Sequence, residues 1–92
     1  MKYRVYQTKR FIKSLKKMMR RGKNGAKIET VIARLANGET LPTQYRDHAL
    51  TGDLTGLRDC HIENDWVLLY YYENDVLILT LSDTGTHSDL FG

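Results

Sequence analysis

The sequence predicts an α+β fold over residues 1–92, in which an N-terminal strand and a helical hairpin pack on an antiparallel sheet in the order βααβββ. Three observations lead to this prediction. Apolar residues recur at helical spacing in two consecutive segments before residue 37. Three strand-like segments follow, and Asn74-Asp75 between the last two is typical of a tight hairpin turn. Helices followed by a run of strands indicate an α+β arrangement.

The first 38 residues predict one short strand and two helices. Apolar side chains alternate over Tyr3–Tyr6, and Thr8 can act as the N-cap of the helix that follows. The apolar stripe of this helix has helical period and consists of Phe11, Ile12, Leu15, Met18 and Met19. Gly22 and Gly25 break the helix, and a second one is expected from about residue 26 to residue 36. Gly38 suits a left-handed C-terminal cap, and the two helices are expected to form an antiparallel hairpin.

The second half predicts a loop and three strands. Residues 41–56 contain three turn-forming residues and are expected to form a loop that carries His48. The expected strands cover residues 57–62, 66–73 and 76–81, and residues 84–92 are expected to be a short polar tail. The last two strands are almost wholly apolar, which predicts a sheet covered by helices on one face and partly buried on the other.

Charge is divided along the chain. Residues 1–28 contain eleven Lys and Arg and no acidic residue, whereas all eleven Asp and Glu lie in residues 29–92 with three Arg. The cations outside the apolar stripe of the first helix are Lys9, Arg10, Lys13, Lys16, Lys17, Arg20 and Arg21. Such a face attracts a polyanion, because neutralising phosphates releases their counterions. A solvated helical surface is the alternative, and nucleic acid is favoured over membrane because the segment lacks a strong apolar interfacial face.

The composition indicates one domain in a reducing cytoplasm. Cys60 is the only cysteine, so no internal disulfide can form, and it is expected to be buried on the opposite face of its strand from Asp59 and His61. The basic N-terminus is not followed by the apolar run of a signal peptide. The longest apolar run covers residues 66–72, far short of the ~20 residues that span a bilayer.

Three histidines carry the candidate chemistry. His48, His61 and His87 are each expected near the end of an element, with a carboxylate or hydroxyl residue close in sequence. If they converge, they could cleave RNA without a metal, because RNA supplies the 2′-hydroxyl nucleophile and imidazole can serve as acid or base near neutral pH. A metal site is disfavoured, because the chain has no HExxH or CxxC element.

Aromatic residues could hold a splayed base by stacking. The candidates are Tyr45, Trp66 and Phe91. For Trp66, packing in the core is an equally weighted alternative.

Three segments together resemble a known family. They are residues 45–48 (Tyr-Arg-Asp-His), 56–66 (Gly-Leu-Arg-Asp-Cys-His-Ile-Glu-Asn-Asp-Trp) and 84–92 (Thr-Gly-Thr-His-Ser-Asp-Leu-Phe-Gly). This chain resembles the YafQ branch of the RelE/ParE toxins over nearly its whole length. The resemblance implies a RelE/ParE-like fold and a type II toxin that is a ribosome-dependent mRNA endonuclease. Such a toxin enters the ribosomal A site, cleaves translated mRNA with no metal or cofactor, and thereby inhibits translation. Its partners would be the ribosome, the message and a cognate antitoxin, with operator DNA bound only as the toxin–antitoxin complex and no membrane.

The resemblance also implies roles for individual residues. The positions that match the family's active site are His48, Asp59, His61, Asp65, Trp66, His87 and Phe91. His87 is expected to be the general acid, and either His48 or Asp65 the general base. His61 would orient or stabilise charge, and Asp59 would orient a histidine. Trp66 or Phe91 would contact the message.

Asp83 departs from the family pattern, which usually has Arg before the Thr-Gly-Thr-His motif. An anion here replaces a cation that would stabilise the transition state, and such a loss typically costs about 2.7–4 kcal/mol. Three explanations are open: Arg46 or Arg58 reaches the phosphate instead, the toxin is weakened, or the change inactivates it. The alternative function is therefore a weak or inactive toxin of the same fold, which binds antitoxin and nucleic acid or inhibits a topoisomerase.

Overall fold

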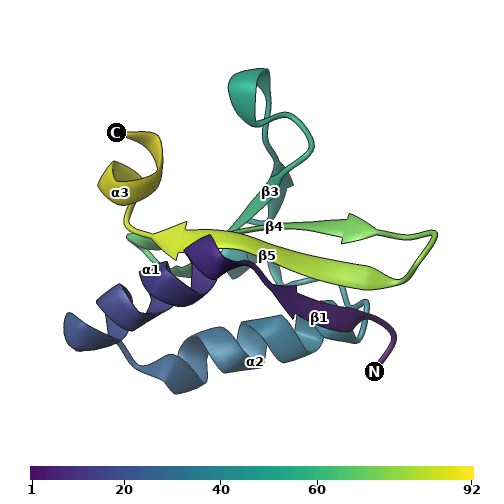
Figure 1. The fold of residues 1–92 in the computed structure, drawn as a ribbon, viewed down its shortest axis with the longest axis horizontal. Helices are drawn as coiled ribbons and strands as arrows, with labels where there is room; N and C mark the ends of the chain where they lie inside the picture. The colour runs from purple at the N-terminus through teal and green to yellow at the C-terminus, as the bar shows by residue number, and fades with distance from the viewer.

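A five-stranded sheet with the strand order β1-β5-β4-β3-β2 runs through the molecule. The computed structural model describes residues 1–92. Its elements are β1 (Arg4–Gln7), α1 (Lys9–Arg20), α2 (Gly25–Ala36), η1 (Thr43–Tyr45), β2 (His48–Ala49), η2 (Gly52–Leu54), β3 (Arg58–Glu63), β4 (Trp66–Glu73), β5 (Ile78–Gly85) and α3 (His87–Phe91). Helices α1 and α2 lie on one side of the sheet, and α3 and the segment around η2 rise on the other (Figure 1). The predicted α+β class and helical hairpin are confirmed.

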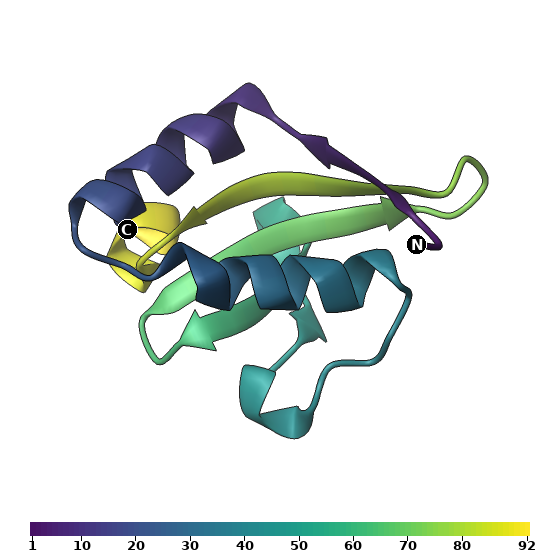
Figure 2. The same cartoon turned by 90° about the horizontal axis from the view of Figure 1, so that it is seen from below.

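The sheet is mixed rather than wholly antiparallel. Strands β3, β4 and β5 pair antiparallel, as predicted, and β2, which was not predicted, pairs antiparallel with β3. Strand β1 pairs in parallel with β5, with Val5 opposite Leu79. A short hairpin turn forces antiparallel pairing only on the two strands that it joins. Strands β1 and β5 are separated by all the other strands and both long helices, so their connection allows either direction of pairing. Figure 2 shows β1 beside β5 at the edge of the sheet, with α2 crossing below the central strands.

Local capping explains where the two long helices begin and end. The hydroxyl of Thr8 accepts the amide of Phe11 at 3.1 Å, and the side chain of Asn24 accepts the amide of Ala26 at 3.0 Å. After α2, Gly38 has the predicted left-handed conformation with φ of +76°. The stripe of α1 faces the core, except that Ile12 at its margin is 39% exposed.

The two faces of the sheet differ in chemistry. Alternate residues of a strand point to opposite faces. The face toward α1 and α2 carries Cys60, Ile62, Trp66, Leu68, Tyr70, Leu79 and Leu81, all part of one buried core. The opposite face carries Asp59 and His61 on β3. It also carries Leu69 and Val67 on β4, because Leu69 pairs with Asp59 and Val67 with His61. The predicted sheet, covered on one face and partly buried on the other, is confirmed.

Three boundaries in the second half were predicted wrongly. The β4–β5 turn has four residues rather than two, so Val76 and Leu77 are exposed and β5 begins at Ile78. Strand β5 then continues to Gly85, and the expected polar tail forms α3. The expected loop contains β2, a strand of two residues. No helix is long and apolar enough to span a membrane.

Candidate active site

One row of paired residues crosses the sheet on the face away from α1 and α2. His48 on β2 pairs with Asp59 on β3, Asp59 pairs with Leu69 on β4, and Leu69 pairs with Asp83 on β5. Directly opposed residues of an antiparallel pair point to the same face. The short strand β2 therefore places His48 beside the buried carboxylate of Asp59, and Asp83 lies on the same face two strands away.

The neighbouring row brings the other two histidines together. His61 on β3 pairs with Val67, and Val67 pairs with Gly85 at the end of β5. Helix α3 begins two residues later, so His87 stands over the end of this row. The rings of His61 and His87 meet edge to face, with centroids 5.0 Å apart. The three histidines, whose convergence the sequence left open, thus lie on one face of the sheet.

The carboxylate of Asp59 lies between two of the histidines. Its side chain is only 5% exposed, and its Oδ1 atom is 3.6 Å from His48 Nδ1 and 3.9 Å from His61 Nε2. No protein group hydrogen-bonds this oxygen. Leaving a buried acceptor without a partner is costly, typically about 1–3 kcal/mol. Asp59 is therefore placed to favour a positive charge on either imidazole.

Ring tautomers follow from the hydrogen bonds of His48 and His87. His48 Nδ1 donates to the carbonyl oxygen of Arg46 at 2.6 Å, because a carbonyl can only accept. His87 Nδ1 donates to Asp65 Oδ1 at 2.7 Å, and the backbone amide of His87 donates to the same oxygen at 2.8 Å. These two bonds lower the pKa of Asp65, the backbone bond most. In both histidines Nε2 is left as the atom that can exchange a proton with a substrate.

Helix α3 is held by a second carboxylate, Asp89. Arg21 donates two hydrogen bonds to it, at 2.6 and 3.3 Å, and Lys17 lies 3.7 Å away. Asp89 also accepts the amide of Thr86, whose hydroxyl accepts the amide of Asp89 in return, forming a capping box. The Arg21 hydrogen bond is the main reason why the pKa of Asp89 is well below its usual value. Because α3 has no buried residue, these polar contacts fix the position of His87.

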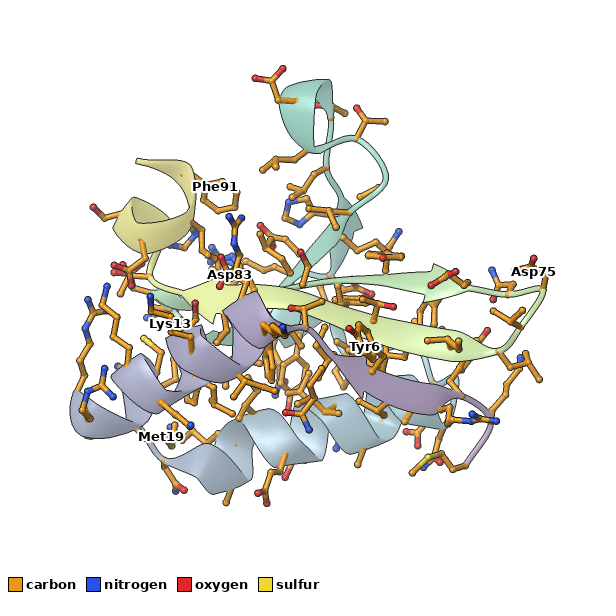
Figure 3. The ribbon with its side chains drawn as sticks, viewed as in Figure 1. Tyr6, Lys13, Met19, Asp75, Asp83 and Phe91 are labelled. Carbon is orange, nitrogen blue, oxygen red and sulfur yellow. The ribbon has the colours of Figure 1, made fainter.

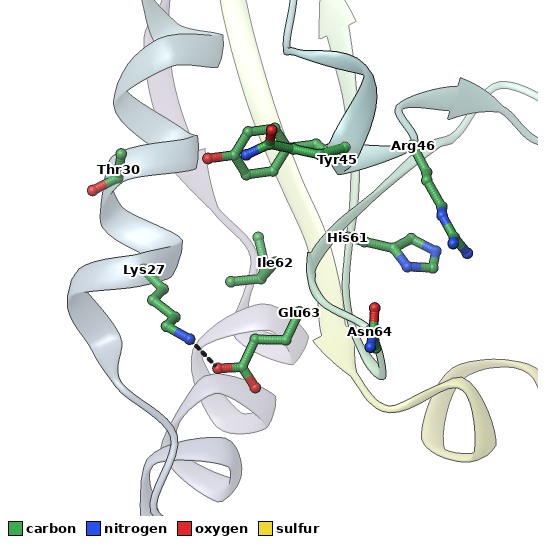
Figure 4. A pocket seen from close by; sticks show the side chains of 9 residues that line it. Lys27, Thr30, Tyr45, Arg46, His61, Ile62, Glu63 and Asn64 are labelled. Atoms are coloured by element: carbon green, nitrogen blue, oxygen red, sulfur yellow. Dashed lines mark hydrogen bonds and ion pairs between the residues drawn. The ribbon is translucent and has the colours of Figure 1, made fainter.

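Electrostatics keep His61 neutral at pH 7. Burial lowers the pKa of His61 most, and the charges of His87, Arg46 and His48 lower it further, against the opposing effect of Asp59. A neutral imidazole can donate a hydrogen bond but does not supply a fixed positive charge. The only permanent cation among these neighbours is Arg46, whose side chain lies next to His61 (Figure 4).

Arg58 lies on the other face of the sheet and does not join the histidines. It pairs across β3–β4 with Tyr70, a core residue, and its Nε atom is 3.3 Å from Asp47 Oδ1. The hydroxyl of Tyr70 donates to the same oxygen at 2.5 Å. The hydrogen bonds with Tyr70 and Asp47 raise the pKa of Arg58. Of the two cations suggested as replacements at position 83, the structure brings only Arg46 to the site.

The three aromatic candidates have different positions. Trp66 is fully buried in the core, where its Nε1 donates to the hydroxyl of Thr84 at 2.9 Å, so its ring is not free to stack on a base. Phe91 is 43% exposed, and its ring centroid lies 6.0 Å from that of His87. Figure 3 shows Phe91 on α3, beyond the sheet face that carries Asp83. Tyr45 is half-buried beside His61, in the wall of a cleft.

The basic residues of α1 are all exposed, and they lie in the helical layer rather than on the histidine face. Two of them, Lys17 and Arg21, reach α3 through Asp89, which connects the basic face to the site. Cys60 is fully buried in the core on the face opposite His61, as predicted. Burial raises the pKa of its thiol, so it is not a nucleophile.

Asp83 lies within the site but away from the histidines. Its side chain is half-buried, and its Oδ1 accepts the amide of Thr84 at 2.8 Å. It also borders a small pocket between α1 and α3 that Lys17 and Asp89 share. No three His, Cys, Asp or Glu side chains are arranged to hold a metal ion.

Sequence reasoning missed Asp89 and the cleft beside His61. The pattern Thr86-x-x-Asp89 is a capping-box signature and could have identified α3 and its carboxylate. Nothing in the sequence signals the cleft, because its walls come from α2, η1 and the β3–β4 turn.

Comparisons with known proteins show the family and the fold of this chain. A family model described as "Bacterial toxin of type II toxin-antitoxin system, YafQ" matches residues 3–92. The mRNA interferase toxin YafQ of Escherichia coli K12 is 37% identical over 83 residues, which cover 89% of this chain and 88% of the relative. The crystal structure of YafQ from E. coli BL21(DE3) superposes with a TM-score of 0.91 at 33% identity, covering 98% of this chain and 99% of that one. A crystal structure of the E. coli DinJ–YafQ complex contains a chain with a TM-score of 0.89 at 34% identity, covering 98% and 99%.

Proposed function

This chain belongs to the YafQ family of bacterial toxins from type II toxin–antitoxin systems, and we propose that it is an endoribonuclease that cleaves translated mRNA on the ribosome. The observation that carries the proposal is the pair formed by His48 and His87. Each ring is fixed through Nδ1 and offers Nε2 on the same face of the sheet. A proton acceptor and a proton donor are what cleavage by an internal nucleophile requires.

The reaction needs no atom beyond the message and these side chains. Nε2 of His48 takes the proton of a 2′-hydroxyl, and the 2′-oxygen attacks the adjacent phosphorus. The bond from phosphorus to the 5′-oxygen of the next nucleotide breaks, and that oxygen takes a proton from Nε2 of His87. The products are a 2′,3′-cyclic phosphate and a free 5′-hydroxyl. Asp65 orients His87 rather than acting as the base, because the Nδ1 and the amide of His87 both donate to its Oδ1.

Five further residues support this chemistry. Arg46 is the cation beside His61 and stabilises the charge that develops on the phosphate, a role that Asp83 cannot fill. Neutral His61 donates a hydrogen bond to a phosphate oxygen, and Asp59 holds the histidines on either side of it. Phe91 is the exposed aromatic residue next to the acid and stacks on a base of the message. Trp66 supports the site from the core.

Partners follow from the family and from the charge distribution. We assign the exposed cations of α1 to ribosomal RNA, because a concentrated basic face binds phosphate backbone. The cytoplasm is the compartment where this substrate occurs. A cognate antitoxin is the expected inhibitor, by analogy with the DinJ–YafQ complex of E. coli, and operator DNA would be bound by the pair together.

Asp83 favours a second candidate function. An anion on the catalytic face repels the phosphate, so the chain could be a toxin of low activity that binds its antitoxin and nucleic acid. Cleavage separates the two candidates, whereas salt-sensitive binding would be common to both.

Primer extension on a defined message tests the proposal, in a reconstituted translation reaction with and without ribosomes. We expect frame-dependent cleavage only with ribosomes, and loss of at least about a hundredfold in His48→Ala and His87→Ala. Asp75→Ala, in the exposed β4–β5 turn, is the control that should cleave like the wild type. Undiminished cleavage in either histidine variant would remove that residue from the mechanism. No cleavage by the folded wild type would leave the low-activity binding protein.

A further inference from the structure

A cleft with a volume of about 530 Å³ opens beside His61, between α2, η1 and the β3–β4 turn (Figure 4). This volume lies within the range of small-molecule binding sites, about 300–1,000 Å³. Apart from His61 and Arg46, none of the residues that line the cleft has a role in the mechanism above. Its position matters because it shares His61 and Arg46 with the site, so a group bound there would be continuous with the message at the cleaved bond.

The walls of the cleft have the chemistry of a base-binding site. Tyr45 forms one wall, with the guanidinium of Arg34 5.9 Å from its ring centroid, and Ile62 is a second, buried apolar contact. Gln44 and Asn64 add two exposed side-chain amides. An aromatic ring supplies stacking to any base, and amides can donate to or accept from a base edge.

The charges of the cleft are suited to a phosphate-bearing ligand. Its only carboxylate, Glu63, is paired with Lys27 at 2.7 Å and with Lys23 at 2.8 Å. Hydrogen bonds from Lys23 and Lys27 lower the pKa of Glu63. Arg46, in contrast, has no carboxylate within ion-pairing distance. Arg46 is therefore an unpaired cation in the lining of the cleft, next to His61 (Figure 4).

We propose that this cleft binds the message nucleotide next to the cleaved bond and sets the base preference of the enzyme. The base stacks on Tyr45, the amides of Gln44 and Asn64 contact its edge, and Arg46 holds the phosphate that connects it to the reacting nucleotide. Splayed single-stranded bases are read by aromatic stacking and by hydrogen bonds to their edges. This inference rests on the proposed function and adds a specificity site to it.

The test uses a message library randomised around one cleavage site, on ribosomes, with KM, kcat and base preference read separately. Tyr45→Ala should raise KM by about fivefold to a hundredfold, the usual loss when one stacking aromatic is removed, with a smaller change in kcat. Tyr45→Phe keeps the ring and should restore most of the affinity. Asn64→Ala and Gln44→Ala, which alter exposed side chains, should change the base preference more than the rate. Tyr6→Ala removes an exposed tyrosine from β1 and is the matched control.

Separate outcomes distinguish this inference from the proposed function. Suppose that the wild type cleaves, that Tyr45→Ala has the same KM as Tyr6→Ala, and that both amide variants keep the base preference of the wild type. The proposed specificity site would then be wrong, and the proposed endonuclease activity would stand. If the wild type does not cleave, the endonuclease is wrong. The cleft is then tested by NMR titration of the wild type with the four nucleoside 3′-monophosphates. Shifts centred on Tyr45 and Asn64 would support binding there, and their absence would overturn it.

Discussion

Replacing Asp83 by Arg should raise cleavage of the message by between about fourfold and about 300-fold. Asp83 and Asp59 lie in one row with Leu69 between them, so their backbones are roughly 10 Å apart at the usual strand spacing. In the proposed mechanism the phosphate lies near Asp59, because His48 and His61 flank that carboxylate. The substitution changes the charge at position 83 by two units. Its interaction with one negative charge on the phosphate about 10 Å away then changes by about 0.8 kcal/mol at a dielectric constant of 80 and by about 3.3 kcal/mol at 20. These energies correspond to roughly fourfold and 300-fold in rate.

Two control variants separate the effect of position 83 from a general effect of charge. Asp83→Asn removes the charge but keeps an acceptor for the amide of Thr84, so it should give about half of the gain on a logarithmic scale. Asp75→Arg makes the same charge change in the β4–β5 turn, at the far end of the sheet from Asp83 (Figure 3). Primer extension on programmed ribosomes measures all three. If Asp83→Arg is no faster than Asp75→Arg, the phosphate does not sense position 83 and the electrostatic reasoning is refuted.

Three further predictions concern the groups around the histidines. Asp89→Ala removes both the Arg21 bonds and the capping box, so cleavage should fall at least fivefold. The thermal midpoint should fall by less than about 5 °C, because only α3 is released. Cleavage equal to that of the wild type would show that α3 needs no anchor. The pKa of His61 is lowered in the folded chain, so the unfolded chain binds more protons just below pH 6.5. The free energy of unfolding should therefore fall as the pH drops through this window. His61→Gln should flatten that part of a urea-denaturation pH series, and an unchanged slope would assign it to other groups. Asp59→Asn should lower cleavage at least tenfold more than Asp65→Asn does, because Asp59 is buried and Asp65 is exposed. The thermal midpoint of Asp59→Asn should not fall. Equal losses of cleavage in the two variants would show that burial of the carboxylate does not matter.

The parts of the fold that the sequence predicts are those that a local pattern determines. The period of α1, its Thr8 cap and the Gly38 cap are all local features, and the structure confirms each of them. Strands β3 and β4 are long apolar runs and were found for the same reason. Strand β2 and helix α3 are too short for any period to show. Strand β2 depends on its pairing with β3, and the capping box is the one local signal of α3. They are also the elements that deliver His48 and His87.

The convergence of the histidines was predictable as a hypothesis, but the roles of their neighbours depended on which face each side chain takes. Trp66 was ambiguous because β4 is apolar on both faces, so alternation does not tell core from surface. Arg58 was not ambiguous in the same way. It lies two residues before Cys60 and must share its face, which is opposite to Asp59 and His61. Applying the strand period to Arg58 would have excluded it and left Arg46.

A difference in burial between two carboxylates explains how similar histidines can take opposite roles. Asp59 is almost fully buried and has an oxygen without a hydrogen bond, so it gains most when a neighbouring imidazole becomes positive. Asp59 is therefore placed to stabilise the positive ring that a base at His48 would form during the reaction. Asp65 is 63% exposed, and water screens its attraction for a protonated ring. Asp65 therefore offers less electrostatic stabilisation than Asp59, which suits the role of acid proposed for His87. The proposed base thus lies beside the buried carboxylate and the proposed acid beside the exposed one, and the comparison of the two Asp→Asn variants tests whether this difference matters.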